Sequence, residues 1–316
     1  MIPGGHRLRT ALLALFVAAL SSACSSTPQT DALLALPPAG LPRQVELTGV
    51  PFFPQAGNDC GPAALATVLG QAGVTTTIAE LEPLVMTPDR QGTLQNDLIA
   101  AARREGRLVV PVDTVESLTE EIAAGHPVLV FQNLGVATYP IWHYAVAVGY
   151  DLDTPKLVLR SGEEARRLTY LATFERTWER SGRFGLVVVE PGDLPASADA
   201  DAIMAAAASL EQAGQADAAA ATYAAATERW PDRAGLWLGL GNASYAAGRL
   251  DASAAAFAEA TERAPDDAAA WNNLAHVLHE QGKEREATDA ARRAIGLGGP
   301  YAATAAETLR AIERRT

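Results

Sequence analysis

Hydrophobic and polar positions follow two different patterns along the chain. Between residues 44 and 192, apolar positions spaced three and four apart give way to short continuous apolar runs. The first pattern predicts helices over 60–73, 93–106 and 115–125. The second predicts strands over 126–133, 142–151, 156–161 and 184–190. Helices that come first and antiparallel strands that follow indicate an α+β domain over 44–192.

The second half of the chain loses the strand pattern, and alanine dominates it. Similar residues recur there every 34 positions. The clearest sets are Ile203, Trp237 and Trp271, then Gly214, Gly248 and Gly282, then Ala226, Ala260 and Ala294. This period resembles the tetratricopeptide repeat, whose unit is a helix–turn–helix pair. We expect a linker over 193–199, an all-α tetratricopeptide-repeat solenoid of three repeats (200–233, 234–267 and 268–301), and a capping helix over 302–316.

The first residues have the pattern of an export signal. A basic segment at 6–9 precedes an apolar run at 11–20 that is too short to span a bilayer, and small residues then lead to Cys24. This arrangement resembles a bacterial lipoprotein signal. We expect a signal peptide over 1–23, a lipid on Cys24, and a flexible tether over 24–43. The alternative is an ordinary secretory signal with an incidental cysteine.

Lipidation would anchor the protein in the bacterial cell envelope, and Ser25 favours the periplasmic side of the outer membrane in a Gram-negative cell. The formal net charge of −12 argues against nucleic-acid binding, which needs clustered Lys and Arg. The chain contains two cysteines. If Cys24 carries lipid, Cys60 has no intramolecular partner, and the count leaves open a reactive thiol or a buried structural one.

The residues around Cys60 favour the reactive interpretation. The segment DCGPAALATVL predicts a helix that begins at the cysteine, where unpaired N–H groups favour a thiolate. A nucleophilic cysteine needs a base, and His143 opens an apolar strand, whereas His126 is expected to be a solvated turn residue. Gln55, five residues before Cys60, could donate to an oxyanion.

Several segments together resemble the bacteriocin-processing (double-glycine) cysteine peptidase family, which has a papain-like fold. They are VPFFPQAGNDCGPAALATVL, GHPVLVF, WHYAVAVGYD and LTYLATFERTWE. The resemblance implies that Cys60 is the nucleophile, His143 the general base and Gln55 the oxyanion residue. It extends to exported, lipoprotein-type members that are joined to tetratricopeptide repeats.

The sequence departs from this family at the residue that should orient the histidine. The family has an Asp-Pro pair on the next strand, but Arg160 and Ser161 stand there in this chain. Ser161 could hold the imidazole by a neutral hydrogen bond, and Asp151 or Asp153 could do so if the turn folds back. Members that cut double-glycine leaders are usually attached to a membrane exporter, so a cytoplasmic leader peptidase is not expected here.

The sequence therefore predicts an exported, lipid-anchored cysteine peptidase whose repeats recruit a protein partner or substrate. Related acyl-transfer chemistry, such as transglutaminase-like activity, would use the same residues. A competing hypothesis is a non-catalytic adaptor of the envelope that binds an extended peptide. We expect no cofactor and no metal, and we interpret His276 and His279 as a polar helix face.

Overall fold

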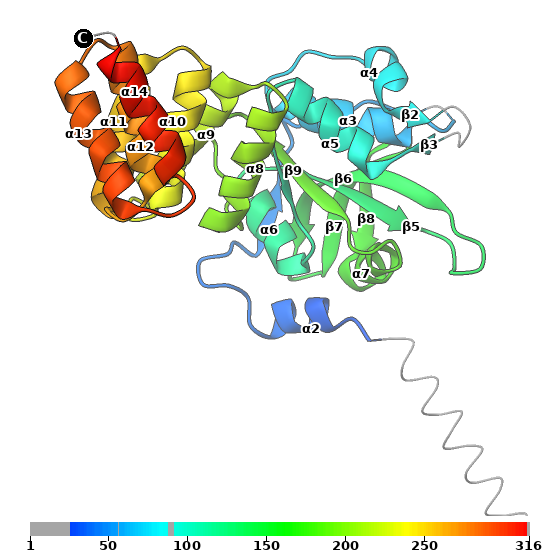
Figure 1. Cartoon of the computed structure of the whole chain (residues 1–316). Helices are drawn as coiled ribbons and strands as arrows, with labels where there is room; N and C mark the ends of the chain where they lie inside the picture. Colours follow the sequence, from blue (N-terminus) through cyan, green and yellow to red (C-terminus); the bar gives the residue numbers. More distant parts are fainter. Residues whose placement is uncertain (1–25, 56, 88–91, 315–316) are drawn as a thin grey trace, which may run out of the picture.

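The computed structural model describes residues 26–55, 57–87 and 92–314 of the chain (Figure 1). The predicted signal peptide (1–23) and the predicted lipidation site, Cys24, lie outside the described residues. None of the helices in the described part has both the length and the hydropathy to cross a bilayer.

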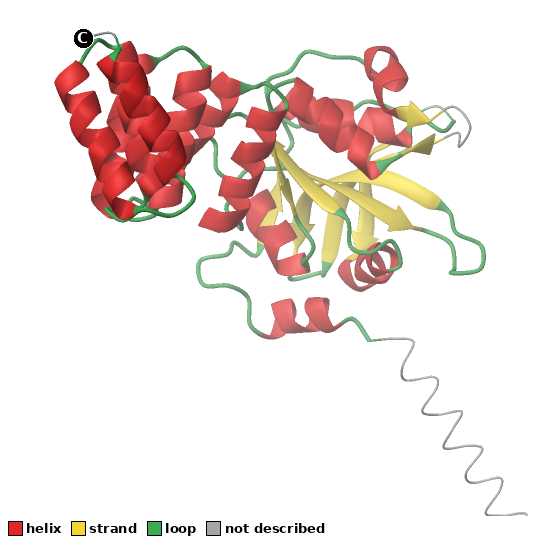
Figure 2. Cartoon of the chain, viewed as in Figure 1, coloured by secondary structure: helices red, strands yellow, loops and turns green. Residues whose placement is uncertain are grey.

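A seven-stranded antiparallel sheet forms the centre of the first domain (Figure 2). Its order is β4-β9-β5-β6-β7-β8, and β1 pairs with the far end of β6. The strands are β1 (Gln44–Glu46), β4 (Leu108–Pro111), β5 (Val128–Asn133), β6 (Trp142–Asp151), β7 (Lys156–Ser161), β8 (Glu164–Tyr170) and β9 (Gly185–Val189). The apolar runs predicted β5, β6, β7 and β9.

Helices cover both faces of this sheet because its central strands are apolar on both sides. Along β5, Val128 and Val130 point into one core and Leu129 into the other. On one face lie α3 (Cys60–Gln71), α4 (Ile78–Val85) and α5 (Gln95–Arg104), and on the other lie α6 (Val115–Ala123) and α7 (Leu171–Glu179). A small hairpin of β2 (Met86–Thr87) and β3 (Gly92–Thr93) packs beside the start of α3.

The expectation of a flexible tether over 24–43 is wrong for part of that segment, because α2 (Pro28–Ala35) is a helix packed on the domain. Its first N–H groups are bound by a buried carboxylate. Gln29 N and Thr30 N donate to Glu175, at 3.0 and 2.8 Å, and Glu175 is only 1% exposed. Val115 N in turn donates to Gln29 Oε1 at 2.7 Å. A buried acid thus fixes a segment whose composition resembles a linker.

The second half is entirely helical over its described residues and folds as stacked helix pairs. The helices are α8 (Ala200–Gln212), α9 (Ala216–Arg229), α10 (Ala234–Ala246), α11 (Leu250–Arg263), α12 (Ala268–Glu280), α13 (Glu284–Leu297) and α14 (Ala302–Glu313). Gly214, Gly248 and Gly282 recur because each turn within a pair needs φ near +74°. The aromatic ring of Phe257 packs where Gly241 has no side chain, so the helices approach closely.

The first helix pair, α8 and α9, packs directly on the first domain. One hydrophobic core contains Val187 and Val189 of β9 together with Ile203 and Leu210 of α8. Gln215 Nε2 also donates to the carbonyl of Arg104, at 2.8 Å. The repeats are therefore continuous with the first domain rather than suspended from it.

Candidate active site

A cavity of about 610 Å³ opens where the start of α3, the β2–β3 hairpin and the β5–β6 hairpin meet. Cys60, His143 and Gln55 all line it. Its other lining residues are Gly57, Asn58, Gly92, Thr93, Leu94, Phe131, Ile141, Trp142 and Tyr144. The structure thus brings together three side chains that are separated by up to 88 positions in the sequence.

Cys60 is the first residue of α3 and is half-buried. Thr93 packs against the following residue so closely that a Cβ on Gly61 would collide with it, which explains the glycine after the thiol. The backbone N–H of Tyr144, next to His143, hydrogen-bonds to the Cys60 sulfur. This bond brings the thiol to the start of β6.

The surroundings of Cys60 act on the pKa of its thiol in both directions. Burial raises the pKa of the thiol, and the nearby carboxylate of Asp59 raises it further. Hydrogen bonds from the backbone N–H groups of Tyr144, Gly61 and Cys60 lower this pKa, but by less. The net direction is upward, so burial works against the thiolate that a helix start favours.

His143 is the second residue of β6, and its Nε2 lies 2.8 Å from Ser161 Oγ. Ser161 ends β7 and is 3% exposed, so this hydrogen bond is protected from solvent. Burial lowers the pKa of His143, and the charge of Arg167 on β8 lowers it further. The imidazole is therefore neutral at neutral pH.

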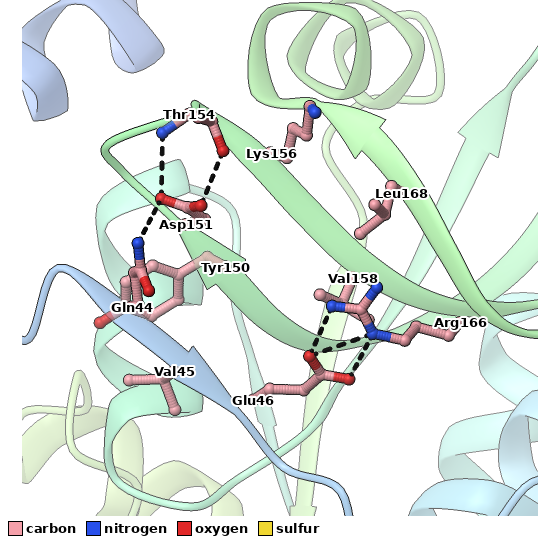
Figure 3. A pocket seen from close by; sticks show the side chains of 10 residues that line it. All are labelled: Gln44, Val45, Glu46, Tyr150, Asp151, Thr154, Lys156, Val158, Arg166 and Leu168. Atoms are coloured by element: carbon pink, nitrogen blue, oxygen red, sulfur yellow. Dashed lines mark hydrogen bonds and ion pairs between the residues drawn. The ribbon is translucent and has the colours of Figure 1, made fainter.

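The alternative orienting residues, Asp151 and Asp153, lie at the opposite end of β6 and are engaged elsewhere. Asp151 accepts hydrogen bonds from Thr154 N, Thr154 Oγ1 and Gln44 Nε2 (Figure 3). Asp153 accepts one from Arg43. The hypothesis that either aspartate orients His143 is therefore wrong.

Gln55 ends an irregular segment that connects β1 to the cavity. Its N–H donates to the carbonyl of Gly162 at 3.1 Å, in the turn directly after Ser161. Its side chain lines the same cavity as Cys60. The end of β7 and the turn after it therefore contact both His143 and the segment that ends at Gln55.

The apolar walls of the cavity were not predicted from the sequence. The rings of Phe131 and Trp142 stack with their centroids 5.2 Å apart, and the centroids of Phe131 and Tyr144 lie 4.4 Å apart. Trp142 is 51% exposed, and Leu94 and Ile141 are also exposed beside it. The only sequence signal was the pair of apolar residues directly before His143.

His126 is not the solvated turn residue that the sequence suggests. It is buried, with Nδ1 2.7 Å from Glu121 Oε2 and Nε2 3.2 Å from Asp193 Oδ2. Ser197 also donates to Glu121 Oε1 from its N–H (2.7 Å) and its hydroxyl (2.6 Å). This cluster joins the α6–β5 turn to the segment that enters the repeats, far from Cys60.

The helical half has its own cavity of about 340 Å³, between α10, α12 and α14. Polar side chains line most of it, namely Asn242, Tyr245, Asn272, Asn273, His276, Thr304 and Thr308. His276 and His279 each pair with a carboxylate, Glu280 at 3.1 Å and Glu284 at 2.7 Å. Within the described ranges, no group of three or more His, Cys, Asp or Glu side chains could hold a metal ion.

Comparisons with known proteins agree with this division of the chain. Residues 47–185 match the Peptidase_C39 like family, and residues 204–267 and 245–303 match the tetratricopeptide repeat. The first domain is C39-like. The predicted fold class, an α+β peptidase domain followed by a helical repeat region, is thereby confirmed.

Individual relatives of the C39-like domain and the repeats are distant or short. A segment of 47 residues is 55% identical to an uncharacterized protein of Methanothermobacter thermautotrophicus, covering 15% of this chain and 32% of that protein. The chain thus spans about a third of the length of this curated relative. A C39-like peptidase from Bacillus anthracis is similar at a TM-score of 0.40 and 19% identity, over 47% of this chain and 98% of that one.

The repeats are similar to the type III secretion chaperone SycD of Yersinia enterocolitica, solved in complex with a peptide of the translocator YopD. The TM-score is 0.35 and the identity 18%, over 36% of this chain and 92% of that one.

Proposed function

We propose that this protein is an exported, lipid-anchored cysteine peptidase in which Cys60 is the nucleophile, His143 the general base and Gln55 an oxyanion donor. The observation that carries the proposal is that all three side chains line one cavity, in which His143 also has a buried hydrogen-bond partner. The match to a peptidase family over residues 47–185 supports it.

The hydrogen bond to Ser161 assigns the two ring nitrogens of His143 their roles. A base that accepts a proton on Nδ1 must carry its hydrogen on Nε2, and that N–H then donates to Ser161 Oγ. As the Cys60 sulfur attacks a peptide carbonyl, the S–C bond forms, the thiol proton moves to Nδ1, and the carbonyl electron pair moves to oxygen. The amide of Gln55 and the N–H of Cys60 stabilise that oxyanion.

Collapse of the tetrahedral intermediate expels the amine, which takes the proton from His143 and leaves a thioester on Cys60. Water then attacks the thioester, with His143 again accepting the proton, and the thiol leaves as the carboxylic acid forms. Because burial disfavours the charged forms of both Cys60 and His143, we expect the proton to move during attack rather than before it. Ser161 orients the imidazole without the charge of an acid.

The side chains around the cavity suggest which peptide substrates it could bind. Leu94, Phe131, Ile141 and Trp142 make apolar walls, so we expect an uncharged, apolar residue beside the scissile bond. The polar cavity of the repeats, lined by Asn242 and Asn273, is suited to the backbone of a protein partner or substrate segment. A lipid on Cys24 would hold both domains at the envelope membrane.

The proposal can be tested with a peptide library prepared from a bacterial proteome and incubated with the purified full chain. We expect new termini with apolar residues beside the cut, detected by mass spectrometry. They should disappear in Cys60→Ala and in His143→Ala. The same termini from Cys60→Ala, or none from the wild type, would refute the peptidase.

The neutral orienting group and the raised pKa of Cys60 favour a second candidate, a non-catalytic adaptor that binds an extended peptide in the same cavity. In the library experiment an adaptor would retain peptides without cutting them, and Cys60→Ala would retain the same set. Cleavage that depends on Cys60 would exclude it.

The lipid anchor has a separate test, because Cys24 lies outside the described residues. Globomycin, which blocks lipoprotein signal cleavage, should cause the precursor to accumulate in membranes. A fully processed protein in the presence of globomycin would show that Cys24 carries no lipid.

A further inference from the structure

Arg160 and Ser161 stand where the family has its Asp-Pro pair, and the catalytic scheme above gives Arg160 no role. It is the residue before Ser161 near the end of β7, and its side chain is half-buried. The guanidinium reaches across to the irregular segment between β1 and Gln55. Nη2 donates to the carbonyl of Val50 at 3.1 Å and to that of Thr48 at 3.5 Å, while Nη1 donates to the carbonyl of Ala165 on β8.

Contacts from the end of β7 and from the turn after it therefore fix the segment 48–55. Arg160 holds it at Thr48 and Val50, and the carbonyl of Gly162 holds it at the N–H of Gln55. The intervening residue, Ser161, holds His143. The three consecutive residues Arg160 to Gly162 thus contact both the segment 48–55, which ends at the proposed oxyanion donor Gln55, and the proposed base, His143.

This segment needs such support because it lacks a strand partner at these positions. Val50 is buried, 4% exposed, and a buried carbonyl without a donor is costly. A planar guanidinium can donate to several carbonyls in fixed directions, which an ammonium group on a flexible chain does less well. Arg160 is suited to holding the segment in one position relative to β7.

We propose that Arg160 is a positioning residue that sets the place of Gln55 relative to Cys60, through Val50 and Thr48. This inference rests on the proposed function, since it assigns Arg160 to the oxyanion side of that site. In this chain the end of β7 orients the base through the hydroxyl of Ser161 and positions the oxyanion donor through Arg160.

A neighbouring arginine provides a matched control. Arg166 on β8 forms a bidentate ion pair with Glu46 on β1, with Nε and Nη2 each 2.9 Å from a carboxylate oxygen (Figure 3). It also joins β8 to the chain that leads toward Gln55, but it contacts a strand residue upstream of Thr48. Arg166→Gln should therefore remove a comparable surface contact without moving Gln55.

The first measurement is amide hydrogen exchange over residues 47–55, which does not depend on catalysis. Arg160→Gln should increase exchange in this segment, Arg160→Lys should have an intermediate effect, and Arg166→Gln should leave it as in the wild type. Thermal unfolding of each variant establishes that the domain remains folded. Unchanged exchange over 47–55 in Arg160→Gln would overturn the proposal.

The second measurement is steady-state kinetics on a synthetic peptide chosen from those cleaved in the library experiment. Arg160→Gln should lower kcat by roughly 10- to 100-fold with little change in KM, because a misplaced oxyanion donor acts on the transition state. The acid limb of the pH profile, which reports His143, should stay in place. In a Gln55→Ala background, Arg160→Gln should cause no further loss.

The outcomes separate the two proposals. A full additional loss in the Gln55→Ala background, or an unchanged kcat in Arg160→Gln, would refute the positioning role while Cys60-dependent cleavage still supports the peptidase. If the wild type shows no cleavage that depends on Cys60, the peptidase is wrong and the proposed positioning of its oxyanion donor by Arg160 falls with it. Hydrogen exchange would then still report whether Arg160 holds the segment.

Discussion

In the C39-like domain His143 is half-buried and His126 is buried, and their surroundings differ in charge. His143 has a neutral hydroxyl on Nε2, a positive charge nearby on Arg167, and a cavity beside it. His126 lies between the carboxylates of Glu121 and Asp193. The first histidine is kept neutral and able to accept a proton, whereas the second is stabilised in its charged form.

The pKa directions follow from this difference. Burial lowers the pKa of both imidazoles, and at His143 the charge of Arg167 acts in the same sense. At His126 the hydrogen bond to Glu121 and the charges of Asp193 and Glu121 overcome burial, so that pKa is raised. The same fold thus disfavours the charged imidazole at one histidine, beside an arginine, and favours it at another, where two carboxylates converge.

The largest expected effect concerns the structural histidine. Glu121 is fully buried, and it accepts hydrogen bonds from His126 and from Ser197, so Glu121→Ala leaves the imidazolium of His126 without its main partner. We expect a loss of about 3–5 kcal/mol in the free energy of unfolding, measured by urea denaturation.

The control is Glu120→Gln on the same helix. Because burial and the neighbouring acids Glu116 and Glu121 already disfavour the charge of Glu120, this change should cost little. Equal losses in the two variants would show that the cluster contributes no special stability.

A second prediction concerns a substitution that gives His143 a carboxylate partner, as His126 has. Ser161→Asp places a carboxylate on His143 Nε2 and should raise the pKa of that imidazole by about one unit or more. Since the base must be unprotonated, activity toward a cleaved library peptide would then be lost at a higher pH than in the wild type. Ser161→Asn, which keeps a hydrogen-bond acceptor without the charge, is the control. If the acid limbs of the Asp and Asn variants coincide, the charge of the partner does not set the basicity of His143.

A third prediction concerns the pH dependence of stability. His126 has a raised pKa in the folded state, so its contribution is fully present below the unfolded value of about 6.5 and is lost as the pH rises above it. His143 has a lowered pKa, so it costs stability as the pH falls below about 6.5. Removing His126 and removing His143 should therefore change the slope of stability against pH in opposite directions.

The measurement is urea denaturation from pH 5 to pH 8 for the wild type, His126→Asn and His143→Asn. The difference between the wild type and His126→Asn should shrink as the pH rises through this range. For His143→Asn, the stability relative to the wild type should increase as the pH falls. Slopes of the same sign would contradict the assignment of opposite environments.

Much of the fold was predictable because central strands and repeat helices carry their own patterns. β5 and β6 are continuous apolar runs, and the glycines of the repeats mark turns that need a positive φ. β8 was missed because EARRLTY is exposed along nearly its whole length and lacks the alternation of a half-buried strand. α2 was missed because the carboxylate that fixes its start, Glu175, lies 145 residues later.

The candidate site was also predictable only in part. The residue types that could act were identifiable, since a lone thiol before Gly-Pro and a histidine at the mouth of an apolar strand stand out in sequence. Their surroundings were not, because the contacts that set them come from distant segments. Arg160 reaches Val50 across 110 positions, and Asp193 reaches His126 across 67. Local composition cannot report whether such a partner is charged.

The smallest expected effect tests whether the open side of the His143 site contacts substrate, in contrast to the closed cluster around His126. Trp142 stacks on Phe131 at the mouth of the cavity and is 51% exposed, so its ring can be covered by a bound peptide. Trp142→Ala should raise KM for a cleaved library peptide by about 5-fold, the equivalent of roughly 1 kcal/mol for one aromatic contact, with kcat nearly unchanged. Tyr170→Ala is the control, because Tyr170 is 63% exposed on β8 and does not line the cavity. If both variants raise KM equally, exposed aromatic area rather than the cavity wall governs binding. If neither does, the peptide reaches Cys60 from another side.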